Sequence, residues 1–278
     1  MLMSNNPIIL MTLCAGFLLL GAGSCTVRED RDLCPSYLSI DYSSLQSSGL
    51  ADNPSAKVEA ALFDDDGLCW SSRYALSECP SSEEVQVTRS HPRLVVLVHD
   101  DPDRNYLSGG TQVRCEPGQP VDALYLHSET VDCSGEGTRS VVQQRKQFST
   151  LVFSDSADGA LLRMYDLVLR GTTCGFDAED GTALDGVYEC MPEDEDGNGR
   201  ISARIPRQKR DDLILEFRDK EGGQKWFTSP VGQYLFSAGY DPDAPDLPDY
   251  EIRIDFSRAL LYLRVSGWTD EYLYSLYE

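Results

Sequence analysis

Basic residues and histidines are scarce in this 278-residue sequence. Lysine and arginine together number 24 against 46 aspartates and glutamates, which gives a formal charge of −22, and there are only 3 histidines. A chain this acidic has too few cations to neutralise nucleic-acid phosphates, so no nucleic-acid partner is expected. It would also be repelled by an anionic lipid surface, so any membrane attachment must be covalent or by insertion.

Catalytic and cofactor motifs are also missing. Beyond the first 24 residues there is no G-x-S-x-G, H-E-x-x-H, phosphate-binding loop, dinucleotide fingerprint or C-x-x-C. The histidines His91, His99 and His127 stand in separate segments. His99, beside Asp100 and Asp101, could mimic a base with its orienting carboxylate, but a histidine at a strand end explains it more simply. We therefore expect no enzymatic activity, no cofactor and no structural metal site.

The first 24 residues contain no charged side chain, and residues 7–23 are almost wholly apolar. This run is shorter than the roughly 18–20 residues of a spanning helix. It ends in the small residues Gly21–Ser24 ahead of Cys25, which is the layout of an export signal with its cleavage site. The segment resembles a bacterial lipobox, which implies a signal peptide over 1–24 and a diacylglycerol on the Cys25 thiol. An ordinary secretory signal or a retained anchor is the alternative.

A charged tether, residues 25–33, follows the predicted cleavage site. Its stretch Arg28–Asp32 is rich in acidic residues. In Bacteroidia-type lipoproteins, an acidic patch at this place resembles the signal for display on the outer face of the outer membrane. A charge run is also simply a solvated linker, and both interpretations stay open.

Seven cysteines follow Cys25, and in an exported protein they are expected to form disulfides. An odd number leaves at least one thiol free or paired with another chain. Cys174 and Cys190 bracket one loop-rich segment, and closing a loop of that size would contribute about 3 kcal/mol. Weaker candidate pairs are Cys115–Cys133 and Cys69–Cys79. The full set is Cys34, Cys69, Cys79, Cys115, Cys133, Cys174 and Cys190.

Alternation of apolar and polar residues predicts short strands throughout the chain. The sequence Asp64–Gly67 predicts a hairpin turn, because Asp-Gly accepts positive φ. Arg93–His99 is apolar on both faces and indicates a central strand. Short strands separated by turns at about ten-residue spacing favour β-sandwiches. The predicted strands cover 37–42, 58–63, 93–99, 121–126, 147–153, 164–169, 200–205, 213–217, 250–256 and 260–265.

A composition break at Cys133–Gly137 divides the chain after the tether. We predict one β-sandwich over 34–137 and a second over 138–278, each of ordinary domain size. No internal sequence repeat is strong enough to demonstrate duplication.

The string Asp194–Ile201 is the most site-like acidic segment. Asp194, Asp196 and Asn198 fall at positions 1, 3 and 5 of an EF-hand loop, but Ile205 occupies position 12, where a bidentate Glu should close the cage. An acidic turn that enters a strand is the simpler interpretation, and weak calcium binding is the alternative.

Several segments in order resemble one family. They are Leu33–Tyr42 after the tether, the strand and hairpin Val58–Gly67, the strand Leu247–Phe256, and Leu260–Val265 followed by Ser266-Gly267-Trp268. Together they resemble the FimB-type minor fimbrial anchor lipoproteins of Bacteroidia-type (type V) pili, over nearly the whole mature chain. The resemblance implies an all-β fold of two tandem transthyretin-like (Greek-key) β-sandwiches and no enzymatic activity.

The same resemblance implies a function and partners. It implies a surface-exposed outer-membrane lipoprotein, held in the lipid by acylated Cys25, that attaches the fimbrial shaft subunit to the cell and limits shaft length. A fimbrial tip or accessory adhesin subunit is one alternative, and a glycan-binding surface lipoprotein is another. A hydrolase is the least favoured.

The C-terminal tail suggests how such an anchor holds its polymer. Type V pili, which the resemblance brings in, are joined by strand donation. At period two, Tyr272, Tyr274 and Leu276 lie on one face of the tail. The tail is therefore either a donor strand or the final strand of its own domain.

Overall fold

The computed structural model describes residues 35–47, 50–119, 121–156, 164–194, 200–267 and 269–276. These residues belong to one compact unit, Pro35–Glu278. The predicted signal peptide, the tether and Cys25 lie outside the described residues. Within the described ranges, no helix has the length and apolarity needed to cross a membrane.

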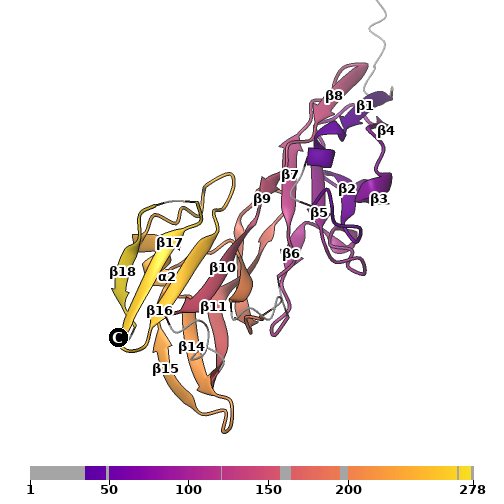
Figure 1. Cartoon of the computed structure of the whole chain (residues 1–278). Coiled ribbons are helices and arrows are strands. Elements are labelled where there is room, and N and C mark those ends of the chain that lie inside the picture. Colours follow the sequence, from indigo (N-terminus) through magenta and orange to yellow (C-terminus); the bar gives the residue numbers. More distant parts are fainter. Residues whose placement is uncertain are drawn as a thin grey trace, which may run out of the picture. The chain divides into compact units, whose positions relative to one another are not determined.

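The first sandwich consists of a three-stranded and a five-stranded sheet (Figure 1). Leu38 and Ile40 of one sheet pack against Val58 and Leu62 of the other. The three-stranded sheet has the order β4-β1-β8, with β1 Ser36–Asp41, β4 Ser82–Val87 and β8 Gly137–Val141. The five-stranded sheet has the order β3-β2-β5-β7-β9, with β2 Lys57–Asp64, β3 Gly67–Ala75, β5 Arg93–His99, β7 Tyr125–Thr130 and β9 Arg145–Lys146.

The second sandwich consists of two five-stranded sheets around a core that contains Phe153, Phe217 and Ile252. One sheet has the order β13-β10-β16-β17-β18, with β10 Phe148–Asp155, β13 Ile201–Pro206, β16 Tyr250–Asp255, β17 Leu260–Val265 and β18 Tyr272–Ser275. The other has the order β12-β11-β14-β15, with β11 Tyr165–Asp177, β12 Ala183–Cys190, β14 Ile214–Asp219 and β15 Lys225–Ser229. The short strand β6 Gln112–Arg114 also pairs with β11, and the helix α2 Val231–Ser237 buries Val231 and Leu235.

The two sandwiches repeat one seven-strand topology. In the first, β1 lies between β4 (antiparallel) and β8 (parallel), facing the order β3-β2-β5-β7. In the second, β10 lies between β13 (antiparallel) and β16 (parallel), facing the order β12-β11-β14-β15. Each strand of the first set thus has a counterpart at the same chain position in the second. Two strands at the end of the chain, β17 and β18, fall outside this repeat.

The predicted all-β class and the β-sandwich architecture are confirmed. The Asp64–Gly67 turn joins β2 to β3, with Gly67 at φ 108°, and the Asp66 N–H donates to Asp64 Oδ1 at 2.9 Å. The strand expected at Arg93–His99 is central, and Val95 and Val96 contribute to different cores.

The strand predicted over 121–126 is largely wrong, because β7 begins only at Tyr125. Val121, Ala123 and Leu124 are buried, as their apolarity suggested, but in a connection that belongs to no strand. The Ala123 N–H donates to the Asp100 carboxylate at 2.8 Å. The Asp100 side chain thus accepts a backbone hydrogen bond that a neighbouring strand would otherwise accept.

The division at residue 137 remains a prediction. Strand pairing favours a later change of sandwich, because β8 pairs with β1 and β9 pairs with β7. Apart from the short β6, which pairs with β11, the first strand that joins the second sandwich is β10, which begins at Phe148.

Candidate functional site

The hairpin β17–β18 is an addition to a sandwich whose counterpart lacks it. β17 pairs with β16 from Tyr250↔Val265 to Asp255↔Leu260, and β18 pairs with β17 on its other side. β18 is therefore the edge strand of its sheet. A strand in this position can separate from its neighbour without breaking the seven-strand core.

The predicted period-two pattern matches the way β18 packs. Leu276 is fully buried, and Tyr272 and Tyr274 pack against the core, whereas Leu273 on the opposite face is 56% exposed. The Tyr274 ring stacks on Tyr234 of α2 with ring centroids 4.3 Å apart. This packing explains the apolar composition of the tail by contacts within its own domain.

Hydrogen bonds also hold the tail. The Tyr234 hydroxyl donates to the Ser275 carbonyl at 2.7 Å, and the Tyr274 hydroxyl donates to the Tyr234 carbonyl at 3.2 Å. Beyond β18, the Leu276 N–H donates to the Ala259 carbonyl at 2.9 Å. Both apolar packing and hydrogen bonds thus hold β18 in its own domain.

The far edge of β8 is the counterpart of the edge that β17 covers in the second sandwich. β8 ends the order β4-β1-β8, and in the described part of the chain no strand pairs with its other side. Arg139 and Val141 are exposed there, Val141 by 44%. An unpaired edge of this kind presents backbone groups to which another strand can add.

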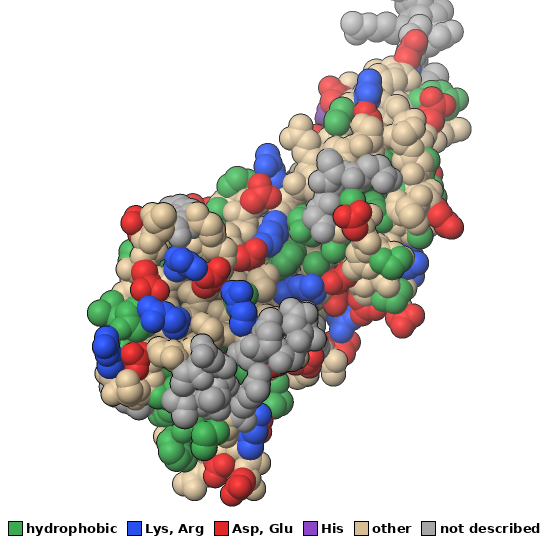
Figure 2. Space-filling view, in the orientation of Figure 1, with side chains coloured by type: hydrophobic (Ala, Val, Ile, Leu, Met, Phe, Trp, Pro, Cys, Tyr) green, Lys and Arg blue, Asp and Glu red, His purple; other side chains and the backbone are tan. Residues whose placement is uncertain are grey.

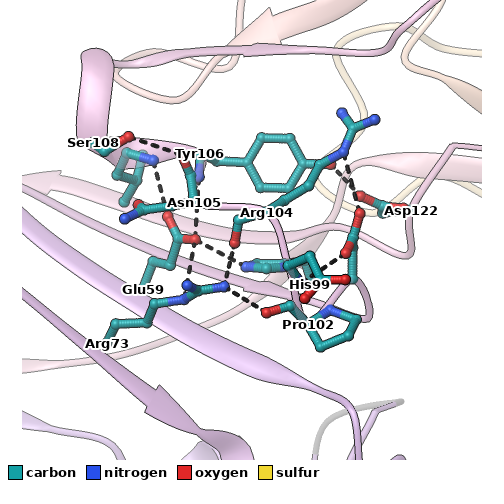
Figure 3. Close-up of polar contacts among 12 residues, drawn as sticks. Glu59, Arg73, His99, Pro102, Arg104, Asn105, Tyr106, Ser108 and Asp122 are labelled. Carbon is teal, nitrogen blue, oxygen red and sulfur yellow. Dashed lines mark hydrogen bonds and ion pairs between the residues drawn. The ribbon is translucent and has the colours of Figure 1, made fainter.

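A buried polar network holds the loop after β5 (Figure 3). Glu59 of β2 is only 2% exposed and His99 of β5 is fully buried, and His99 Nε2 lies 3.1 Å from Glu59 Oε1. The other partners of Glu59 are the N–H of Tyr106 at 3.1 Å, the N–H of Leu107 at 2.9 Å, and Arg73 Nε at 3.8 Å. Arg73 in turn donates to backbone carbonyls of the loop. One carboxylate thus holds the loop that follows β5 at Tyr106 and Leu107.

The outer end of the network surrounds Tyr106. Its hydroxyl donates to the Asp122 carboxylate, and its ring meets the His99 ring edge-on at 5.1 Å. Burial raises the pKa of Asp122, and burial together with the Asp122 hydrogen bond raises the pKa of Tyr106. Arg104 lies 5.7 Å from the centre of the Tyr106 ring and pairs with Asp101 at 3.2 Å. With His99 inaccessible and both Glu59 oxygens bound, this arrangement stabilises the fold rather than presenting a base to a substrate.

Part of this network can be recognised from the sequence. His99 beside Asp100 was visible as a pair, but Asp100 faces elsewhere: its carboxylate pairs with Arg204 Nη1 at 2.8 Å. Glu59 was the stronger signal, because a charged residue inside the apolar run Val58–Phe63 requires a buried partner.

The six described cysteines after the tether are free thiols. In the β11–β12 register, Cys190 lies opposite Leu169, five residues from Cys174 along β11. Five residues of strand span about 16 Å, well beyond the Cα separation of about 7 Å that a disulfide tolerates. The predicted Cys174–Cys190 bond is therefore not formed here and would need a different register. Burial raises the pKa of Cys79 and of Cys115 to about 12.

The acidic string at 194–201 is only partly described. Asp194 follows Glu193, which forms an isolated bridge with Ser202, whereas Asp196 and Asn198 lie outside the described residues. Among the residues that the structure describes, no group of three metal-binding side chains comes together. The weak calcium site thus stays a prediction.

The fold is similar to that of solved bacterial proteins whose names concern polysaccharide binding, adhesion or fimbriae. No family model and no curated protein sequence matches this chain. A candidate polysaccharide-binding protein from Bacteroides thetaiotaomicron matches with a TM-score of 0.57 and 14% identity, over 87% of this chain and 99% of its own. A candidate adhesin from the same organism matches with a TM-score of 0.52 and 14% identity, over 84% of this chain and 96% of its own.

The fimbrial anchor protein Mfa2 from Porphyromonas gingivalis matches with a TM-score of 0.53 and 13% identity, over 84% of this chain and 98% of its own. At these identities the similarity establishes the fold. The names of the three proteins concern binding, adhesion or fimbriae, and none names an enzyme.

Proposed function

We propose that this protein is a fimbrial anchor or minor subunit, which attaches a fimbrial shaft to the outer membrane and limits its length. The lipobox-like segment supports attachment through acylated Cys25. The fold shared with the Mfa2 anchor protein over 98% of that chain supports a fimbrial role.

The observation that carries the proposal is the position of β17–β18 outside the seven-strand repeat. The joint to the shaft forms by strand addition, in which a backbone ladder gives affinity and alternate side chains fill pockets. β18 supplies Tyr272 and Tyr274 as the alternate side chains, and Leu276 directly after the strand supplies the third. The open edge of β8 is the second place where this chain and a shaft subunit join.

Deletion of residues 272–278 tests the donor role. The truncated protein is expected to melt at a lower temperature, since burial of Leu276 alone contributes about 2 kcal/mol, and its folded fraction is expected to retain no fimbriae on cells. Leu273→Glu on the exposed face is the matched control and should retain them. Folded truncated protein that holds fimbriae as well as the wild type rules out β18 as the donor.

Acylation is tested separately with Cys25→Ser. The variant should lose labelling by radioactive palmitate and leave the membrane fraction, because each buried CH₂ of an acyl chain contributes about 0.8 kcal/mol to partitioning. Equal labelling of the variant and the wild type contradicts the lipid anchor.

A surface glycan-binding function is the second candidate. It is favoured by the polar cleft described below and by the fold shared with a candidate polysaccharide-binding protein. Gene neighbourhood separates the two functions: fimbrial genes accompany an anchor, and transporter and glycosidase genes accompany a glycan binder.

A further inference from the structure

A cleft of about 690 Å³ opens beside the outer face of β7. Its size lies within the roughly 300–1,000 Å³ of typical ligand sites. One wall carries Arg93 of β5 and Ser128 and Glu129 of β7, and the segment at Gln143 continues it. The opposite wall carries the β11–β12 turn at Asp180 and the loop 242–245.

The walls are tied to each other by hydrogen bonds, so the cleft is preformed. The Ser128 hydroxyl donates to the Glu179 carbonyl at 2.6 Å. Arg207 is 7% exposed and donates through Nε to Gln147 at 3.1 Å and through Nη1 to the Ala244 carbonyl at 2.9 Å. A preformed cleft loses little conformational entropy when it binds a ligand.

One buried polar side chain in the wall lacks a hydrogen bond on one side. His127 is 8% exposed, and its Nδ1 accepts the Gln143 N–H at 3.2 Å, so the ring proton of the neutral form is on Nε2. Nε2 has no hydrogen-bond partner in the described structure and lies 3.6 Å from Glu129 Oε1. The His127 ring thus lies between the Gln143 backbone and the Glu129 carboxylate in the wall of the cleft.

The charges of the lining indicate the chemical class of the ligand. Three arginines face four carboxylates, so neither an anion nor a cation is strongly attracted; they are Arg93, Arg145 and Arg207 against Glu129, Glu179, Asp180 and Asp243. Among the described residues that line the cleft there is no phenylalanine, tyrosine or tryptophan, so binding rests on hydrogen bonds rather than on stacking against such a ring. Mixed donors and acceptors of this kind suit sugar hydroxyls, each of which both donates and accepts.

We propose that this cleft binds a neutral oligosaccharide. The Arg93 guanidinium and the Gln143 amide donate to sugar oxygens, and the carboxylates of Glu129 and Asp180 accept from sugar hydroxyls. The site is independent of whether the chain anchors a fimbria, because none of these residues belongs to β18 or to the predicted lipid site.

The test uses the full chain in detergent on an array of neutral, sialylated and sulfated oligosaccharides, followed by calorimetry with the strongest neutral binder. Arg93→Ala and Gln143→Ala should each weaken binding by about tenfold. Gln86→Ala, an exposed glutamine of β4, is the matched control and should bind as the wild type does. Melting temperatures of all variants establish that they are folded, and Gln143, which is exposed, remains informative if Arg93→Ala does not fold.

Three outcomes overturn the proposal. They are no binding to any neutral oligosaccharide at millimolar concentration, preference for the acidic glycans, and neutral binding that both cleft variants leave unchanged. Retention of fimbriae by the same variants shows that a failure here leaves the anchor function intact.

Discussion

Replacement of Glu59 by glutamine tests the buried network most directly. Glu59 accepts the N–H groups of Tyr106 and Leu107 on its two oxygens, and His99 shares one of them. A glutamine has one carbonyl oxygen, so one buried N–H then faces the amide NH₂ group. That unsatisfied donor costs about 1–3 kcal/mol.

The Arg73 pair adds a smaller contribution. The Arg73 side chain is 34% exposed, so solvent screens its interaction with the Glu59 carboxylate, and its loss costs about 1 kcal/mol or less. The expected destabilisation of Glu59→Gln is therefore about 1–4 kcal/mol, and in a domain of this size the melting temperature should fall by about 2–16 °C.

Thermal unfolding and amide hydrogen exchange measure the effect. The amides of Tyr106 and Leu107 should exchange faster in Glu59→Gln, because their acceptor is altered. Glu84→Gln, an exposed glutamate of β4, is the matched control and should lie within about 0.5 kcal/mol of the wild type. Unchanged exchange at both amides, with a melting temperature equal to that of the control, would refute the role assigned to Glu59.

Three further predictions concern other parts of the structure. Burial lowers the pKa of His127 in the folded state, so the unfolded chain binds a proton first as the pH falls. The free energy of unfolding should therefore decrease below about pH 6.5. Urea titrations at several pH values should show a smaller decrease in His127→Gln than in the wild type. Cys79 and Cys115, with pKa values of about 12, should react with iodoacetamide at pH 7 only on unfolding, and rapid labelling of folded protein contradicts this. Gly175 has φ 152°, and a Cβ there would lie 2.0 Å from the Val113 carbonyl oxygen. Gly175→Ala should therefore lower the free energy of unfolding in urea by more than about 1 kcal/mol. An unchanged free energy would show that β6 need not lie against β11.

The sequence predicted strands well where the apolar pattern is local. The strands Arg93–His99 and Leu260–Val265 begin and end as expected. In both, the burial of each side chain follows from its own apolarity, so the local pattern is enough to find the strand. The pattern failed at 121–126, where burial is real but the backbone is satisfied by the Asp100 side chain.

Long-range features were beyond the reach of sequence patterns. The repeated topology depends on which strands become neighbours, and parallel neighbours such as β1 and β8 are separated by about a hundred residues of chain. The cleft at β7 likewise joins side chains from Arg93 to Asp243, none of which forms a motif with its sequence neighbours. A different surface covers β16 and β17, where several basic side chains lie close together (Figure 2). There Arg253 pairs with Glu271, and Arg264 pairs with Glu251.

The parallel pairing of the first and last strands of each seven-strand repeat has a mechanical consequence. The chain enters β1 at the Tyr37↔Gly137 end of the β1–β8 ladder and leaves β8 at the Asp41↔Val141 end. Tension along the chain therefore pulls neighbouring strands lengthwise in opposite directions, so that all the ladder bonds bear the load together instead of opening one after another as in a peeled hairpin. β10 and β16 repeat this parallel pairing in the second sandwich, so a pull applied at the end of β16 would load that ladder in shear as well.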